Sequence, residues 1–265
     1  MKIQDVIQFL DGIAPLEWQE NYDNAGLIVG NDQWKCTGIM VCLDSTELIV
    51  DEAIANHCNL IIAHHPIIFS GLKKINGHHY VDKAIIKAIK NDVAIFAIHT
   101  NLDNAYWNGV NGKIADKINI TNTQILQPKN FEGLNGEVIG AGLIGLLNQP
   151  IPIMEFLQKL KDKMELNTLK YTTPIKDFVH SIALCGGSGS FLIQQAIQQN
   201  ADVFITSDLK YHEFFESNEQ IVLVDIGHYE SEKYTIELLY TILQNNFSNF
   251  ALHFTKHTTN PVHYL

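Results

Sequence analysis

Short apolar runs that alternate with helical patterns constrain the fold of this chain more than any other feature of its sequence. Six runs of five or six residues are rich in β-branched or aromatic side chains and end at polar or glycine positions, which is typical of buried strands. The predicted strands are 38–43, 59–63, 93–98, 181–185, 202–206 and 221–225. The predicted helices are 45–57, 80–91, 189–200 and 230–246. This alternation predicts an α/β fold with a mostly parallel sheet.

The sequence also resembles itself at an offset of 143 residues. Residues 39–65 align without gaps on residues 182–208, so that Cys42 matches Cys185. The matched segments agree in pattern, in spacing and in the polar residues at their ends. We therefore expect an internal duplication, with two related α/β units, mostly parallel or mixed sheets, and three layers. Chance similarity between two βαβ units is the alternative.

The expected boundary between the two units follows residue 125. The first unit is 1–125 and the second is 126–265, and the C-terminal part of the second is a candidate to pack back on the first. The region 126–178 differs in character. Its glycine-rich start, GLNGEVIGAGLIG, predicts a short β-ribbon, and 153–166 predicts a helix after two prolines. The sequence leaves open whether this region is an insertion or the start of the second unit.

Composition excludes several classes of protein. The 265-residue chain has 46% hydrophobic and 18% charged residues, which suits one large or two small globular domains and not a disordered or disulfide-scaffold protein. It carries 18 basic and 29 acidic residues, a formal net charge of −11, which argues against non-specific binding to nucleic acid. Every basic residue is a lysine, so no arginine is available to clamp a phosphate or carboxylate with two hydrogen bonds.

The cysteines and the hydropathy pattern favour a soluble cytoplasmic protein without a membrane partner. The four cysteines lack C-x-x-C spacing and lie in or beside apolar stretches, so we expect small buried side chains at Cys36, Cys42, Cys58 and Cys185. Residues 1–18 predict an amphipathic helix and lack the layout of a signal peptide. The most apolar tract, 138–147, has about half of the ~20 residues that a helix needs to span a bilayer.

Polar residues gather where the predicted strands end. In a parallel α/β sheet these carboxyl ends line one crevice, in which ligands bind. The residues at these positions are Asp44, His64, His65, His99, Asp103, Ser207, Asp208, His228 and Glu232. Imidazole nitrogens and carboxylate oxygens hold zinc, manganese, iron or nickel, so this edge is a candidate metal site.

Two pairs in this set have a spacing that suits a shared ion. His228 and Glu232 are four residues apart at the start of a predicted helix, and so lie on one helical face. Helix capping and compensation of the helix dipole are the alternative roles for this pair. His64 and His65 are adjacent at the end of a strand, where Pro66 breaks the alternation of faces. A core histidine beside a solvent-exposed one is the alternative there.

Five residues of this edge are the predicted metal ligands: His64, His65, Asp103, His228 and Glu232. Three imidazoles and two carboxylates exceed what one tetrahedral ion requires. Two ions ~3.5–4 Å apart, bridged by a carboxylate or a hydroxide, use such a set fully. Paired ions lower the pKa of a shared water and polarise a substrate oxygen, which is the chemistry of a hydrolase.

Two further features are candidates for contact with a charged substrate. The backbone N–H groups of CGGSG at 185–189 are a candidate receptor for an anion such as phosphate, and a purely structural turn is the alternative. The side chains that could balance substrate charge are Lys73, Lys74, Lys210 and His212, and ordinary solvent exposure is the alternative for them.

Six segments resemble the NIF-three-like family (NGG-one-interacting factor three), whose bacterial members are labelled GTP cyclohydrolase I type two homologues. They are YDNAGLIVG at 22–30, HHPIIFSGLKKI at 64–75, HTNLDNA at 99–105, CGGSGS at 185–190, TSDLKYHE at 206–213 and IGHYESE at 226–232. The segments follow the family's order, and the combination of HHP, HTNLD and GHYE-x-E is specific.

The resemblance implies a two-domain α/β subunit with a dinuclear centre of two divalent ions, assembled as a homohexameric toroid. The residues that match the family's metal ligands are His64, His65, Asp103, His228 and Glu232. Glu232 matches the bridging carboxylate, and His99 matches a histidine beside the site. Longer relatives carry an extra domain inserted centrally, and this chain resembles the short form.

The family label implies ring opening of GTP at C8 by a metal-activated water, with release of formate and formation of dihydroneopterin triphosphate. No pattern in the sequence identifies a guanine pocket. Three other functions therefore stay open: a two-metal phosphoesterase, a metal-binding scaffold or regulatory interaction protein without turnover, and a protein for metal storage or delivery.

Overall fold

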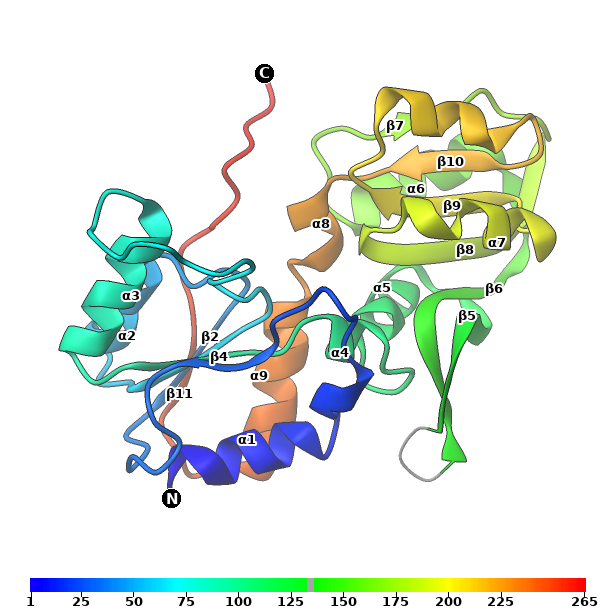
Figure 1. The fold of residues 1–265 in the computed structure, drawn as a ribbon. Helices are drawn as coiled ribbons and strands as arrows, with labels where there is room; N and C mark the ends of the chain where they lie inside the picture. Colours follow the sequence, from blue (N-terminus) through cyan, green and yellow to red (C-terminus); the bar gives the residue numbers. More distant parts are fainter. Residues whose placement is uncertain (133–135) are drawn as a thin grey trace. The chain divides into compact units, whose positions relative to one another are not determined.

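Two units, each built on one mixed β-sheet, make up the chain in this computed structural model, which describes residues 1–132 and 136–265 (Figure 1). The first unit comprises Met1–Leu102 and Thr235–Pro261, and the second comprises Asp103–Tyr234 and Val262–Leu265. This division by packing falls after Leu102, whereas the division expected from the repeat falls after residue 125.

The first unit has a five-stranded sheet. Its elements are α1 (Ile3–Asp11), η1 (Leu16–Trp18), β1 (Gly26–Val29), β2 (Ile39–Cys42), α2 (Glu47–Ala55), β3 (Leu60–Ala63), α3 (Tyr80–Lys90), β4 (Ala94–Ala97), α9 (Thr235–Asn246) and β11 (Leu252–Phe254). The strand order is β1-β4-β3-β2-β11. The β1–β4 pair is antiparallel, and the other pairs are parallel.

Helices cover both faces of this sheet, because the side chains of its central strands are buried on both sides (Figure 1). Met40, Ile61 and Ile95 point to one face and form a core with residues of α2 and α3. On the other face lie α1 and α9 (Figure 1), and Phe9 packs edge-on against Phe247 with ring centroids 5.3 Å apart. The expected three layers are therefore present in this unit.

The second unit has a six-stranded sheet. Its elements are α5 (Val110–Ile118), β5 (Thr121–Glu132), β6 (Val138–Pro152), α6 (Ile153–Lys163), β7 (Lys170–Tyr171), β8 (Phe178–Ser188), η3 (Ser190–Leu192), α7 (Ile193–Gln198), β9 (Val203–Ser207), η4 (Tyr211–Ser217), β10 (Val222–Asp225) and α8 (His228–Glu232). The strand order is β5-β6-β8-β9-β10-β7. Strands β8, β9 and β10 are parallel, and the outer pairs are antiparallel.

One face of the second sheet packs on α7, through a core that includes Ala183, Ile193 and Phe204. Figure 1 shows α6 behind the same sheet. The short helix α4 (Thr100–Asp103) contains the point at which the chain passes from the first unit to the second.

The sequence predicted the central strands and most helices correctly, and the α/β class with mixed sheets is confirmed. One predicted helix, 230–246, is in fact two helices. It breaks after α8 because α8 belongs to the second unit and α9 to the first. The predicted β-ribbon is formed by β5 and β6, and residues 133–135 of its glycine-rich segment lie outside the described residues. No helix in the described part of the chain has the length and apolar character to cross a membrane.

Candidate metal-binding residues

Three histidines lie together in the first unit, at the carboxyl ends of adjacent strands. His64 and His65 follow β3 directly, and His99 follows β4 by two residues. One ring nitrogen from each lies within 4.8 Å of the others. His64 is fully buried, and the other two side chains are half-buried. Neutral imidazoles grouped in this way are a donor set that a transition-metal ion accepts.

The Nδ1 atom of each of these histidines faces an oxygen acceptor. His64 Nδ1 lies 2.9 Å from the carbonyl oxygen of Ile98. His65 Nδ1 lies 2.8 Å from Oδ1 of Asp44, and His99 Nδ1 lies 2.8 Å from Oδ1 of Asp23. An acceptor at Nδ1 fixes the tautomer that carries its proton there and leaves the Nε2 lone pair as the ligand. The surroundings of this cluster therefore fit metal ligation.

The two carboxylates behind the histidines are themselves held in place. Thr259, in the segment after β11, donates its hydroxyl to Asp44. Asp23 accepts the backbone N–H of Thr100 at 3.0 Å and also its hydroxyl. Burial opposes ionisation of Asp23, but the hydrogen bonds and the charge of His99 outweigh it and lower the pKa of Asp23 to about 2. Asp23 is thus a carboxylate that orients His99.

In the second unit, His228 and Glu232 lie on one face of α8. The Nε2 atom of His228 is 3.0 Å from Oε2 of Glu232, and its Nδ1 atom is 2.6 Å from Oδ2 of Asp208. Burial disfavours the imidazolium, but the hydrogen bonds to Asp208 and Glu232 outweigh burial and raise the pKa of His228 to about 11. Asp208 in turn accepts the hydroxyl of Ser188. The two carboxylates therefore favour the protonated form of His228, and a metal ion bound at Nε2 would have to replace that proton.

Asp103 is the first residue of the second unit. Its backbone carbonyl accepts a hydrogen bond from the Asn111 side chain at 3.0 Å. Burial raises the pKa of the Cys185 thiol, and the negative charges of Asp103 and Glu232 raise it further. Both carboxylates therefore lie close enough to this thiol for their charges to act on it.

The CGGSG turn packs closely against the carboxylate of Glu232. A Cβ atom on Gly187, whose φ is +64°, would lie 2.3 Å from Oε1 of Glu232, so the close approach of the carboxylate requires glycine. The backbone N–H of Gly187 donates to the Ser231 hydroxyl at 2.9 Å. The N–H groups of Gly186 and Gly189 donate to protein oxygens as well. Because the N–H groups of Gly186, Gly187 and Gly189 already have protein acceptors, the structure favours the alternative of a structural turn over a phosphate receptor.

The structure also identifies orienting residues that the sequence did not single out. Asp23 is far along the chain from His99, which it orients, and Thr259 is far from Asp44, to which it donates a hydrogen bond. The only hint of Asp23 in the sequence was the YDN segment at 22–24, which belongs to one of the six family-like segments. Asp44 and Asp208 were noted as strand-end residues, and each now proves to bind one histidine. The four cysteines are buried and free, as predicted.

The fold and these donor sets define an α/β protein of two units that carries histidine and carboxylate groups able to bind metal ions. The sequence profile of the Duf34/NIF3 (NGG1p interacting factor 3) family matches residues 1–261, and the chain belongs to this family. The resemblance drawn from the six segments is thereby confirmed.

Relatives with curated names extend along most of the chain. A Clostridium acetobutylicum protein named GTP cyclohydrolase 1 type 2 homolog is 33% identical over 233 residues, which cover 88% of this chain and 85% of the relative. A Campylobacter jejuni protein of the same name is 32% identical and covers 92% of this chain and 93% of its own length. The crystal structure of Staphylococcus aureus protein SA1388 has a TM-score of 0.90 and 28% identity, with 100% of this chain and 99% of that chain covered.

Proposed function

We propose that this protein is a dinuclear metal-dependent hydrolase that opens GTP with water and releases formate and dihydroneopterin triphosphate. The observation that carries the proposal is that three of the clustered histidines, His65, His99 and His228, each have an orienting carboxylate at Nδ1. Outer carboxylates of this kind are typical of histidines that bind catalytic metals. The names of the curated relatives supply the reaction.

The proposed ligands of two divalent ions are His64, His65, Asp103, His228 and Glu232, with Glu232 as the bridging carboxylate. Zinc, manganese, iron and nickel all suit imidazole and carboxylate donors. When bound, such ions lower the pKa of a shared water and so supply a nucleophile at neutral pH. The chain's own part is to hold each Nδ1 proton on an acceptor, at Ile98, Asp44 and Asp208, so that the opposite nitrogen keeps its lone pair.

Two aromatic side chains beside the histidines favour a substrate with a planar ring. Phe69 packs edge-on against His99 with ring centroids 6.0 Å apart, and Tyr22 lies 6.3 Å from Phe69. These two side chains are 52% and 63% exposed, so both have ring surface available for stacking. A purine stacks on surfaces of this kind, whereas a simple phosphoester does not need them. This observation favours the nucleotide over a general phosphoesterase substrate.

The test combines metal content with turnover. Wild type, His64→Ala/Glu232→Ala and His78→Ala are purified, analysed for metal per chain, and assayed with GTP for formate. His78 is exposed in a loop and is the matched control. We expect two ions per chain and formate release in wild type and control, and loss of both in the double variant.

The alternatives give different results in the same assay. Two ions without formate would discard the cyclohydrolase reaction, and hydrolysis of phosphoesters would then favour a two-metal phosphoesterase. Tight metal without any turnover would favour a scaffold or interaction protein, while weak, exchangeable metal would favour storage or delivery. We further propose a homohexamer, as the family resemblance implies, and sedimentation equilibrium tests it.

A further inference from the structure

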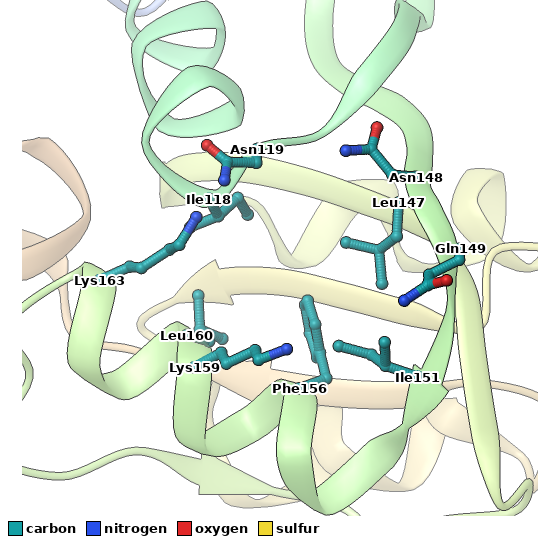
Figure 2. Close-up of a pocket in the computed structure, with 10 residues that line it drawn as sticks. All are labelled: Ile118, Asn119, Leu147, Asn148, Gln149, Ile151, Phe156, Lys159, Leu160 and Lys163. Atoms are coloured by element: carbon teal, nitrogen blue, oxygen red, sulfur yellow. The ribbon is translucent and has the colours of Figure 1, made fainter.

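The second unit has a pocket that none of the candidate metal ligands lines. It has a volume of about 280 Å³ and is bordered by the end of α5, the C-terminal part of β6 and the helix α6 (Figure 2). This volume is just below the range of about 300–1,000 Å³ that is usual for small-molecule pockets. A small organic ligand therefore suits a pocket of this size.

Irregular backbone on two sides creates the pocket. The pairing of β6 with β8 shifts register between Leu146 and Ile151, which is a β-bulge or a comparable irregularity. Such a feature bends the strand and redirects its side chains. On the opposite side, α5 ends at Asn119, whose left-handed conformation with φ of 61° turns the chain sharply into β5. The backbone of the fold therefore contributes to the hollow on two sides.

The floor of the pocket is apolar. Ile118, Phe156 and Leu160 are 5%, 3% and 1% exposed and supply rings and branched carbons from α5 and α6. Leu147 and Ile151 of β6 add partly buried side chains on one wall. A hydrocarbon group placed on this floor gains about 25 cal/mol for each Å² of apolar surface removed from water.

The rim of the pocket is polar and positively charged. Lys159 and Lys163 come from α6, and the amide side chains come from Asn119, Asn148 and Gln149 (Figure 2). Lys159 forms an ion pair with Glu155 at 2.6 Å, in which both side chains are about half exposed. Lys163 has no carboxylate within ion-pair distance in the part of the chain that the structure describes. Figure 2 shows its ammonium group extended toward Asn119.

The two lysines and three amides of the rim favour a ligand with one negative charge, although the chain as a whole has a net charge of −11. The apolar floor favours a ligand with a short apolar body. We propose that this pocket binds a small organic monoanion, namely a carboxylate with an apolar group of about five carbons. Its carboxylate accepts hydrogen bonds from Lys163 and from the neighbouring amides, and its carbon chain lies on Phe156 and Leu160. The proposal is independent of the metal centre and of the reaction proposed above.

The experiment titrates the full-length protein with hexanoate and follows backbone amides by ¹⁵N NMR. Hexan-1-ol, which has the same carbon chain without a charge, is the matched ligand control. We expect saturable shifts below about 10 mM for hexanoate that are confined to α6, to residues 118–119 and to residues 147–151, and at least tenfold weaker binding for hexan-1-ol, since it cannot form the charged hydrogen bonds.

Three variants sharpen the test. Lys163→Met keeps the length and the apolar stem, and we expect it to bind hexanoate at least tenfold more weakly. Lys163→Arg keeps the charge and is expected to stay within threefold of wild type. Lys161→Met lies on the same helix outside the pocket lining and is expected to match wild type. Equal binding of hexan-1-ol, equal losses in the two methionine variants, or shifts spread over the whole chain would overturn the proposal. An unchanged midpoint of urea denaturation in Lys163→Met excludes a general folding defect.

Discussion

The two units share one βαβ arrangement, and they differ in what the ends of its strands carry. In the first unit, β2 pairs with β3 so that Ile39 lies opposite Leu60. In the second, β8 pairs with β9 so that Ile182 lies opposite Val203. Both pairs are separated by the same 143 positions that relate the two halves of the sequence. The repeat in the sequence therefore corresponds to the same alignment of paired strands in both units, β2 with β3 and β8 with β9.

The equivalence extends to individual hydrogen bonds. Asn59 accepts the backbone N–H of Thr37 at 2.7 Å, and Asp202 accepts the backbone N–H of His180 at 2.8 Å. These residues again match at an offset of 143. His57 and Asn200, which follow the equivalent helices, are both left-handed with φ of 57° and 58°. Equivalent positions in the two units thus have the same backbone hydrogen bond and the same left-handed conformation, although their side chains differ.

The strand ends show where the units diverged. His64 and His65 of the first unit occupy the positions of Ser207 and Asp208 in the second. The first pair supplies imidazoles, whereas Asp208 orients an imidazole that comes from α8. The two units also differ in the turn between the first strand and the helix. Asp44 of the first unit orients His65, whereas Gly187, at the equivalent position of the second unit, leaves room for the carboxylate of Glu232. At the strand end, the shared backbone arrangement thus carries candidate metal donors in the first unit, whereas in the second unit it carries Asp208, which supports the second unit's own His228.

The largest effect is expected where the turns differ. In Gly187→Ala the new Cβ would lie 2.3 Å from Oε1 of Glu232, so the carboxylate must move. We expect metal affinity to fall more than about 100-fold, beyond the usual effect of losing an outer partner. Gly77→Ala is the control, because Gly77 has a similar φ of +77° but its Cβ would meet nothing closer than 3.8 Å.

Both glycine variants should lose about 1–2 kcal/mol of unfolding free energy through left-handed backbone strain, measured by urea denaturation. Only Gly187→Ala should lose metal, measured by competition with a chelator. Equal metal affinity in the two variants would show that Glu232 does not need this close approach.

The next effect concerns the carboxylates behind the histidines. Asp44→Asn and Asp208→Asn each replace a charged acceptor at an Nδ1 atom by an amide, and we expect metal affinity to fall by about 10–100-fold in each. Asp51→Asn is the control, since Asp51 pairs with Lys87 on the surface. Isothermal titration with zinc measures all three. An unchanged affinity in either strand-end variant would contradict the orienting role of that carboxylate.

A smaller effect is expected at Asp202, where the first unit has a neutral asparagine. Hydrogen bonds from Lys176, Ser181 and His180 outweigh the effect of burial and lower the pKa of Asp202. A lowered pKa stabilises the folded state above the ordinary carboxyl pKa of about 4, and this contribution is lost as the pH falls through the folded-state value.

The matching experiment uses Asp202→Asn, which keeps an acceptor for the backbone but loses the ion pair with Lys176. We expect wild type to be more stable by about 0.5–1 kcal/mol at pH 7. The difference should shrink as the pH falls below about 4. Urea denaturation at pH 7 and pH 3 measures it, and a difference that grew in acid would contradict the assigned sign.

The smallest effect is expected at the left-handed positions after the two helices. Asparagine tolerates this conformation better than histidine, so His57→Asn should stabilise the protein and Asn200→His should destabilise it. Both residues are exposed, and each change is expected to be about 0.5 kcal/mol or less. Urea midpoints measured side by side check the opposite signs, and a common sign would show that the two positions are not equivalent.

Much of the fold was predictable because local pattern encodes it. Buried strands such as β3 and β9 are short apolar runs, and their polar ends mark the loops in which donors lie. His64, His65, His228 and Glu232 were found in this way, and their assignment as ligands of one dinuclear centre stays a prediction. Asp23 was missed because it faces His99 across 76 positions of sequence, and no periodicity records such a pairing.

The sequence by itself determined the central strands, the parallel βαβ cores, the repeat register and the candidate metal-binding residues at the strand ends, because burial and periodicity act over a few residues. Only the tertiary structure decided that α9 and β11 complete the first sheet and its covering layer, and that Thr259 holds Asp44 from 215 positions away. It also decided that Gly187 leaves room for the carboxylate of Glu232. Those outcomes depend on which side chains packing brings together, and packing is a property of the whole chain.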